Sequence, residues 1–71
     1  NPTWEHITIR WADQGFNKIT ITESTGRELY GESLQKTQRE AVIRRKFAAG
    51  IYLIRLSGPA GQSVVRKFIA R

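Results

Sequence analysis

Few residues in this 71-residue chain could carry out acid–base or nucleophilic chemistry. His6 is the single histidine, and the six acidic residues are scattered singly along the sequence. A catalytic triad, an acid pair or a metal site would need partners at a usable spacing, and none is evident. The chain has no cysteine, so neither a disulfide nor a thiolate zinc site can form. We therefore expect a binding module with no catalytic, cofactor or metal site, and not an enzyme.

The basic residues suggest what such a module would bind. Twelve Lys and Arg against six Asp and Glu give a net charge of +6, which favours a nucleic acid, acidic lipid headgroups or a negatively charged protein surface. The tightest cluster is Arg44-Arg45-Lys46, interpreted here as a solvated loop or strand edge. A second set lies near the C-terminus, at Arg66, Lys67 and Arg71. Charge alone does not choose among the three partners.

The length predicts a single domain over residues 1–71. The chain begins at Asn1 rather than at a methionine, so we expect a fragment of a larger protein. No apolar run has the length of a signal peptide or of a transmembrane helix.

Elements that could position a binding surface follow from the hydrophobic pattern. Apolar and polar residues alternate with the period of a strand, which predicts strands over 7–11, 18–22, 41–43, 51–56 and 64–70. The turn at 23–26 is expected to lead into residues 27–30, and a short edge strand is expected around Leu34. Segment 51–56 is apolar on nearly both faces, which indicates a central strand. Turns are expected at 12–15, 23–26 and 57–61. A helix over 35–49 is the main competitor, because its residues are good helix formers.

Six or seven short strands at this spacing predict an all-β fold, an antiparallel sandwich or a small barrel. Trp11 is expected to belong to the core, because it continues the alternation of Ile7 and Ile9. Tyr52 is expected to be a half-buried ring with a satisfied hydroxyl.

Four landmarks stand in order along the chain. They are Asn1-Pro2, the turn Glu23-Ser24-Thr25-Gly26-Arg27, the run Ala49-Gly50-Ile51-Tyr52-Leu53, and the ending Arg66-Lys67-Phe68-Ile69-Ala70-Arg71. Together they resemble a type A C-terminal sorting domain of the type IX secretion system. The resemblance covers the whole chain, and its most specific part is the Gly-Ile-Tyr element followed by a turn and a basic, apolar final strand.

The resemblance implies an immunoglobulin-like β-sandwich of about seven strands that serves as a secretion signal. Such a domain follows its N-terminal cargo in the same chain. Outer-membrane and periplasmic components of the type IX machinery recognise it in the periplasm and move the cargo to the cell surface or the medium. A sortase-type cysteine protease usually removes it and attaches the cargo to anionic lipopolysaccharide.

The resemblance also assigns residues. The recognition motif is expected at Gly50, Ile51, Tyr52, Arg66, Lys67, Phe68, Ile69 and Arg71, and the structural motif at Asn1, Pro2, Glu23, Gly26 and Arg27. One position departs from the family pattern, because members commonly carry Asp where this chain has Glu23. A Glu side chain is one methylene longer and is expected to shape the turn less well than an Asp would.

Two other functions remain open from the residues alone. A small basic nucleic-acid-binding β-barrel would account for the charge and the two tryptophans, although the aromatic residues do not cluster with basic ones on one strand face. A structural immunoglobulin-like accessory domain of a secreted hydrolase or adhesin would share the predicted fold.

Overall fold

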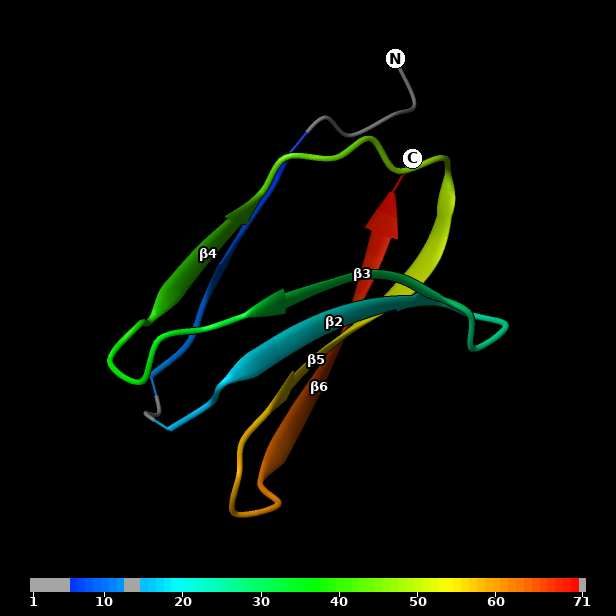
Figure 1. Cartoon of the computed structure of the whole chain (residues 1–71). Helices are drawn as coiled ribbons and strands as arrows, with labels where there is room; N and C mark the ends of the chain where they lie inside the picture. The colour runs from blue at the N-terminus through cyan, green and yellow to red at the C-terminus, as the bar shows by residue number, and fades with distance from the viewer. Residues whose placement is uncertain (1–5, 13–14, 71) are drawn as a thin grey trace.

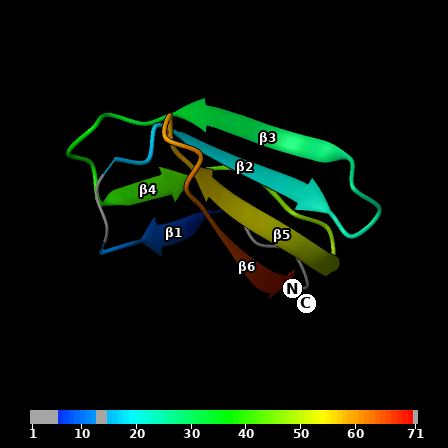
Figure 2. The ribbon, with the colours of Figure 1, turned by 90° about the horizontal axis from the view of Figure 1, so that it is seen from below.

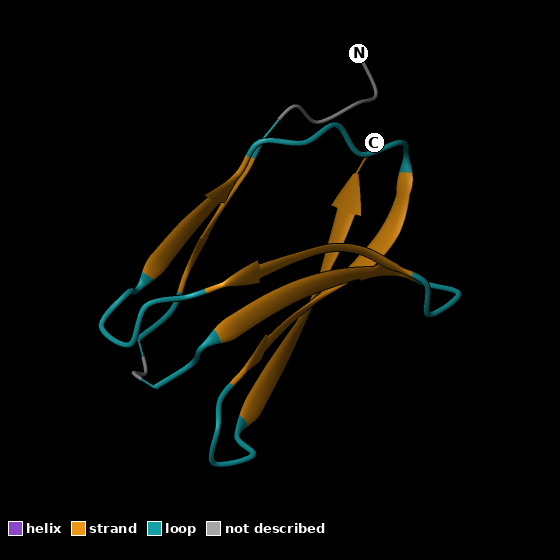
Figure 3. Cartoon of the chain, in the orientation of Figure 1, coloured by secondary structure: helices purple, strands orange, loops and turns teal. Residues whose placement is uncertain are grey.

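The computed structural model describes residues 6–12 and 15–70. These residues form six strands joined only by loops and turns (Figure 3). The strands are β1 (Ile7–Arg10), β2 (Lys18–Glu23), β3 (Glu28–Ser33), β4 (Glu40–Ile43), β5 (Gly50–Ser57) and β6 (Ser63–Ala70). The competing helix over 35–49 is therefore wrong, since β4 occupies its centre.

The strands form two antiparallel sheets that face each other (Figures 1 and 2). The larger sheet has the order β3-β2-β5-β6, and the smaller one consists of β1 and β4. This arrangement confirms the predicted all-β class and is consistent with an immunoglobulin-like sandwich. It also confirms segment 51–56 as a central strand, because β5 pairs with β2 on one side and β6 on the other.

Alternate residues of the strands fill the space between the sheets. The buried apolar side chains from strands are Ile19, Ile21, Ala41, Ile43, Tyr52, Ile54, Leu56 and Ala70. Each large one contributes about 1.5–3 kcal/mol when it is removed from water. Three further side chains, Ile7, Ile9 and Trp11, are partly buried and pack against this cluster. Trp11 therefore lies at the margin of the core to which it was predicted to belong.

Three buried side chains come from the connections rather than from strands. Phe16, Leu34 and Phe47 are all less than a tenth exposed. The short edge strand predicted around Leu34 is wrong, because the edge strand is β3 and Leu34 follows its last residue. Leu34 is held by its backbone N–H, which donates to the carbonyl of Asn17 at 2.9 Å. An isolated leucine among polar residues here marks a loop that closes the core.

The predicted turns carry glycines with positive φ. The turn at 23–26 is present, with Gly26 at a φ of 97°, a backbone conformation that glycine adopts without the steric cost of a Cβ. The turn at 57–61 joins β5 to β6 and is closed by the Gly61 N–H, which donates to the Gly58 carbonyl at 3.1 Å. The turn predicted at 12–15 includes residues 13 and 14, which lie outside the described residues.

Candidate recognition site

The two segments of the predicted recognition motif lie side by side in the larger sheet. The register of β5 and β6 pairs Gly50 with Ala70, Ile51 with Ile69, and Tyr52 with Phe68. Lys67 lies opposite Leu53, one residue further along β5. A hairpin therefore brings together residues that stand 14 or more positions apart in sequence. On its other side Tyr52 pairs with Glu23 of β2, so the structural motif joins the same end of the sheet.

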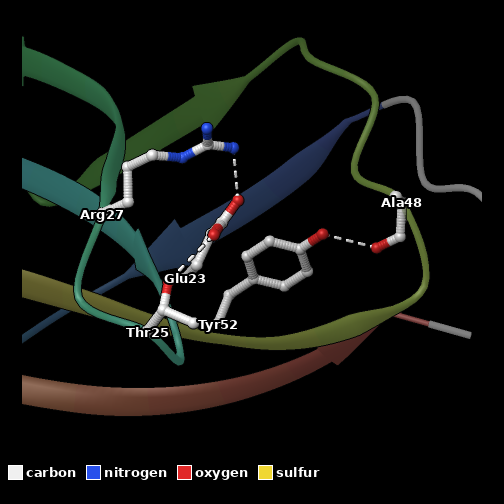
Figure 4. A network of polar contacts seen from close by, with 5 residues as sticks. All are labelled: Glu23, Thr25, Arg27, Ala48 and Tyr52. Atoms are coloured by element: carbon white, nitrogen blue, oxygen red, sulfur yellow. Dashed lines mark hydrogen bonds and ion pairs between the residues drawn. The ribbon is translucent and has the colours of Figure 1, made fainter.

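The turn after β2 is closed by backbone hydrogen bonds and by side-chain contacts, the latter drawn in Figure 4. The Glu23 N–H donates to the Arg27 carbonyl and the Gly26 N–H to the Glu23 carbonyl, both at 2.9 Å. The Glu23 carboxylate accepts from Arg27 Nη2 at 2.6 Å and from Thr25 Oγ1 at 3.0 Å. These two hydrogen bonds, Arg27 first, lower the pKa of the Glu23 carboxyl below its ordinary value of 4.5.

The geometry qualifies the expectation that Glu would shape this turn less well than Asp. The Glu23 carboxylate reaches across the turn and bridges a hydroxyl and a guanidinium. The additional methylene group of Glu, compared with Asp, lengthens the side chain that makes these two contacts. The turn is thus held by a side-chain bridge as well as by backbone hydrogen bonds.

The inner side of the motif is an aromatic cluster of Phe47, Tyr52 and Phe68. Phe47 meets the other two rings edge-on, with centroid distances of 5.3 Å to Tyr52 and 5.4 Å to Phe68. Tyr52 and Phe68 stack at 5.2 Å with an interplanar angle of 26°. Both arrangements are among the favourable ones for aromatic rings.

Tyr52 is more deeply buried than predicted, with only 6% of its surface exposed. The expectation that its hydroxyl is satisfied is confirmed, since the hydroxyl donates to the Ala48 carbonyl at 2.5 Å (Figure 4). This bond fastens the loop before β5 to the sheet. Tyr52 therefore holds this loop against the sheet.

The outer side of the same two strands is exposed and apolar. Ile51 is 47% exposed and Ile69 is 44% exposed. Lys67 shares this face, because residues directly opposite on paired strands point to the same side of a sheet. The predicted recognition motif is thus divided between two faces, with Tyr52 and Phe68 inside and Ile51, Lys67 and Ile69 outside.

Arg66 occupies a third kind of position. It lies opposite the buried Ile54 and so points to the inner side of β6, yet it is exposed at the edge of the sheet. Its Nη1 donates to the Val65 carbonyl at 3.2 Å. Together with Ile9, Trp11 and Val64 it lines a hollow between β1 and β6. Asn1, Pro2 and Arg71 lie outside the described residues.

The comparison with protein families identifies the chain. Residues 1–71 match the model of the secretion system C-terminal sorting domain, the sorting signal of type IX secretion. The chain belongs to this family. Comparison with curated proteins and with solved structures gave no match. The family identifies the type IX machinery as the partner that recognises this sorting domain, and it implies export to the cell surface or secretion.

Nothing in the described part of the sorting domain gathers three potential metal ligands among its His, Asp and Glu residues. His6 lies exposed before β1. No helix able to cross a membrane occurs in residues 6–12 and 15–70.

Sequence reasoning missed three residues of this end of the sorting domain. Phe47 completes the aromatic cluster from a loop. In the sequence, the feature that could have indicated its burial is a single aromatic residue directly after a basic run. Leu53 and Val65 are exposed on the outer face at 38% and 41%. The strand period would have found Leu53, since it lies two residues after Ile51.

Proposed function

We propose that this sorting domain directs the protein that carries it across the outer membrane by presenting the paired β5–β6 end to the type IX machinery. The single observation that supports this is the pairing of residues 50–52 with residues 68–70, in a chain whose whole length matches the family. Two remote parts of the predicted motif lie side by side only when the domain is folded. The recognised feature is then a folded label rather than a linear peptide.

Membership of the family supports the following route for this proposal. The parent protein reaches the periplasm, where periplasmic and outer-membrane components of the machinery bind the folded domain. The cargo crosses the outer membrane, and a sortase-type cysteine protease removes the domain and joins the cargo to anionic lipopolysaccharide. In this scheme the domain is a ligand and a substrate, and the cargo carries whatever catalytic activity the parent has.

The fold suits this role. Its buried residues form one apolar cluster in the described part of the chain, so apolar packing between the two sheets stabilises the shape that would be recognised. The alternative of a nucleic-acid-binding barrel draws no support from Trp11, because its ring is partly buried and packs against the core instead of being free to stack on bases.

The deciding experiment is removal of residues 1–71 from the parent protein in its native cells. We expect the truncated parent to accumulate in the periplasm, measured by cell fractionation and immunoblotting. Normal arrival of the truncated parent at the surface would exclude a sorting role and would favour a structural accessory domain.

The processing step has its own measurement. Cleavage predicts that the surface form of the parent lacks the domain, a mass difference of 8.1 kDa for the whole chain, and that attachment to lipopolysaccharide makes the remaining mass heterogeneous. A homogeneous surface form that retains the domain would contradict cleavage and leave export itself intact.

A shorter truncation is a poor test in view of the structure. Removal of residues 68–71 is expected to block export, but it also removes Phe68 from the aromatic cluster and the buried Ala70. A loss of export could then result either from unfolding of the domain or from lost recognition, and the truncation does not distinguish the two. Substitution of exposed residues separates the two.

A further inference from the structure

The outer face of the larger sheet carries an unusual concentration of exposed apolar side chains. Five large hydrophobic residues are exposed among those that the structure describes, and four of them are Ile51, Leu53, Val65 and Ile69 of β5 and β6. The fifth, Val42, points outward from the opposite sheet. We call the first four residues the outer patch.

The register makes the outer patch contiguous. Ile51 lies directly opposite Ile69, and Leu53 and Val65 are diagonal neighbours on the two strands. Side chains in such positions on one face are close enough to touch. Contiguous apolar surface on a small domain commonly marks a place where a partner binds.

Cations accompany the outer patch. Lys67 lies opposite Leu53, and Arg55 lies opposite Val65, so both stand within the apolar rows. Lys18 of β2 is on the same face, two residues from Thr20, which pairs with Arg55. The acidic residue on this face is Glu28, which pairs with Thr22 of β2 and lines a shallow hollow together with Arg55, Leu53 and Val65. No acidic side chain lies within ion-pair distance of Lys67 or Arg55 among the described residues.

We infer that the outer patch is the docking surface through which a protein of the export machinery binds this domain, and that the matching surface is apolar at its centre and acidic around it. This deepens the proposed function and rests on it. Aliphatic side chains provide the contact area, while unpaired cations steer the approach and select against the wrong partner.

Other occupants fit the outer patch less well. A second copy would place Lys67 and Arg55 in one interface with their counterparts, because a two-fold interface uses the same surface of both subunits, and the like charges would repel. A lipid surface is bound by side chains that reach several ångströms into the headgroup region, whereas each aliphatic residue here is more than half covered within a strand. A single-stranded nucleic acid would need rings for stacking, and the patch is aliphatic.

The test uses the full parent protein in its native cells and the double variant Ile51→Ser/Ile69→Ser. We expect the ratio of surface to periplasmic parent to fall about tenfold or more, since central interface residues carry most of the binding energy. Lys67→Glu is expected to lower the ratio as well, and Lys67→Arg to preserve it. The matched controls are Val42→Ser, with the same 38% exposure as Leu53, and Lys36→Glu in an exposed turn.

Folding is checked by the resistance of the domain to limited trypsin digestion in the periplasmic parent. If the double variant loses this resistance, the export of the Lys67→Glu variant alone tests the docking surface, because the Lys67 side chain is exposed and its replacement is not expected to unfold the domain. Normal export of a folded Lys67→Glu variant and of a folded double variant, beside blocked export after removal of residues 1–71, would overturn the docking surface and leave the sorting role standing. Normal export after removal of residues 1–71 would overturn both.

Two measurements on the purified parent address the other occupants. Flotation with phosphatidylglycerol vesicles that is lost in the double variant would assign the patch to lipid. A dimer in sedimentation that is lost in the same variant would assign it to a second copy. Either result would overturn docking to a machinery protein, and a monomer that does not float supports it.

Discussion

The inner and outer faces of β5 and β6 are built from alternate residues of the same two strands, yet they have different surroundings. Tyr52 and Phe68 point inward and pack against Phe47 from a loop. Their sequence neighbours Ile51 and Ile69 point outward and remain close to half exposed. One short motif thus contains residues that stabilise the domain and residues available to a partner.

The difference bears on how a sequence motif in a strand is interpreted. Because side chains alternate between faces, adjacent motif residues cannot both contact the same flat partner. A substitution at Tyr52 or Phe68 is expected to act on folding, and one at Ile51, Lys67 or Ile69 on binding. Export assays that treat the motif as one unit would mix these two effects.

The largest expected effect lies on the inner face. Phe47→Ala removes a side chain that is 2% exposed and leaves a cavity against two rings, which should lower the free energy of unfolding by about 3–5 kcal/mol. Urea denaturation followed by circular dichroism measures it. A loss below about 1 kcal/mol would mean that the aromatic cluster does not hold this end of the sandwich.

The sharpest comparison of the two faces uses the same substitution twice on β5. Ile54→Ala on the inner face, at 7% exposure, should cost about 2–5 kcal/mol. Ile51→Ala on the outer face, at 47% exposure, should cost about 1 kcal/mol or less. Denaturation midpoints of the two variants give the comparison directly, and equal losses would contradict the assignment of faces.

A smaller effect is expected from the hydroxyl of Tyr52. Tyr52→Phe keeps the stacked ring and removes the donor to the Ala48 carbonyl, which should cost about 0.5–1.5 kcal/mol in the free energy of unfolding. Tyr30→Phe is the control, because its hydroxyl donates to the Glu32 carboxylate in a more open position, at 2.6 Å. A larger loss for the control than for Tyr52→Phe would show that the loop before β5 is held by other contacts.

The smallest effect concerns the exposed turn beside this end. The folded-state pKa of Glu23 lies below its ordinary value of 4.5, so its ionised form stabilises the folded state above about pH 4.5, and this contribution is lost as the pH falls through the folded-state pKa. Glu23→Gln should therefore be slightly less stable than the wild type at pH 7, and the difference should shrink at pH 3. Thermal denaturation at both pH values measures it.

A double-mutant cycle provides the control for the turn. Arg27→Gln should reduce stability at pH 7 in the same way, and the two substitutions together should cost less than their sum, because they break one contact. Strict additivity would mean that the carboxylate and the guanidinium act independently.

The sequence predicted the local elements well and the tertiary contacts poorly. Alternation located β1, β2, β4, β5 and β6, whereas β3 was anticipated only over 27–30. Glycine-containing turns were predicted correctly at 23–26 and 57–61. Burial of Leu34 and Phe47 was missed because both stand in polar or basic connections, where local periodicity carries no information about what a loop covers.

The division of the recognition motif was missed for a different reason. Segment 51–56 is apolar at Ile51 and Leu53 as well as at Ile54 and Leu56, so its pattern does not reveal which face meets the opposite sheet. That choice depends on pairing with β2 and β6 and on the position of the smaller sheet. The membership of the chain in its family was nevertheless predicted from landmarks spread over its whole length.

The place of β6 in the sheet also has a consequence during protein synthesis. A ribosome that stops anywhere before Ser63 releases a chain in which β5 has lost one of its two neighbours and the Tyr52 ring has lost its stacking partner. Such a product has neither a complete sandwich nor the β6 half of the outer patch. Loss of β6 therefore removes core residues and outward-facing residues of the motif together.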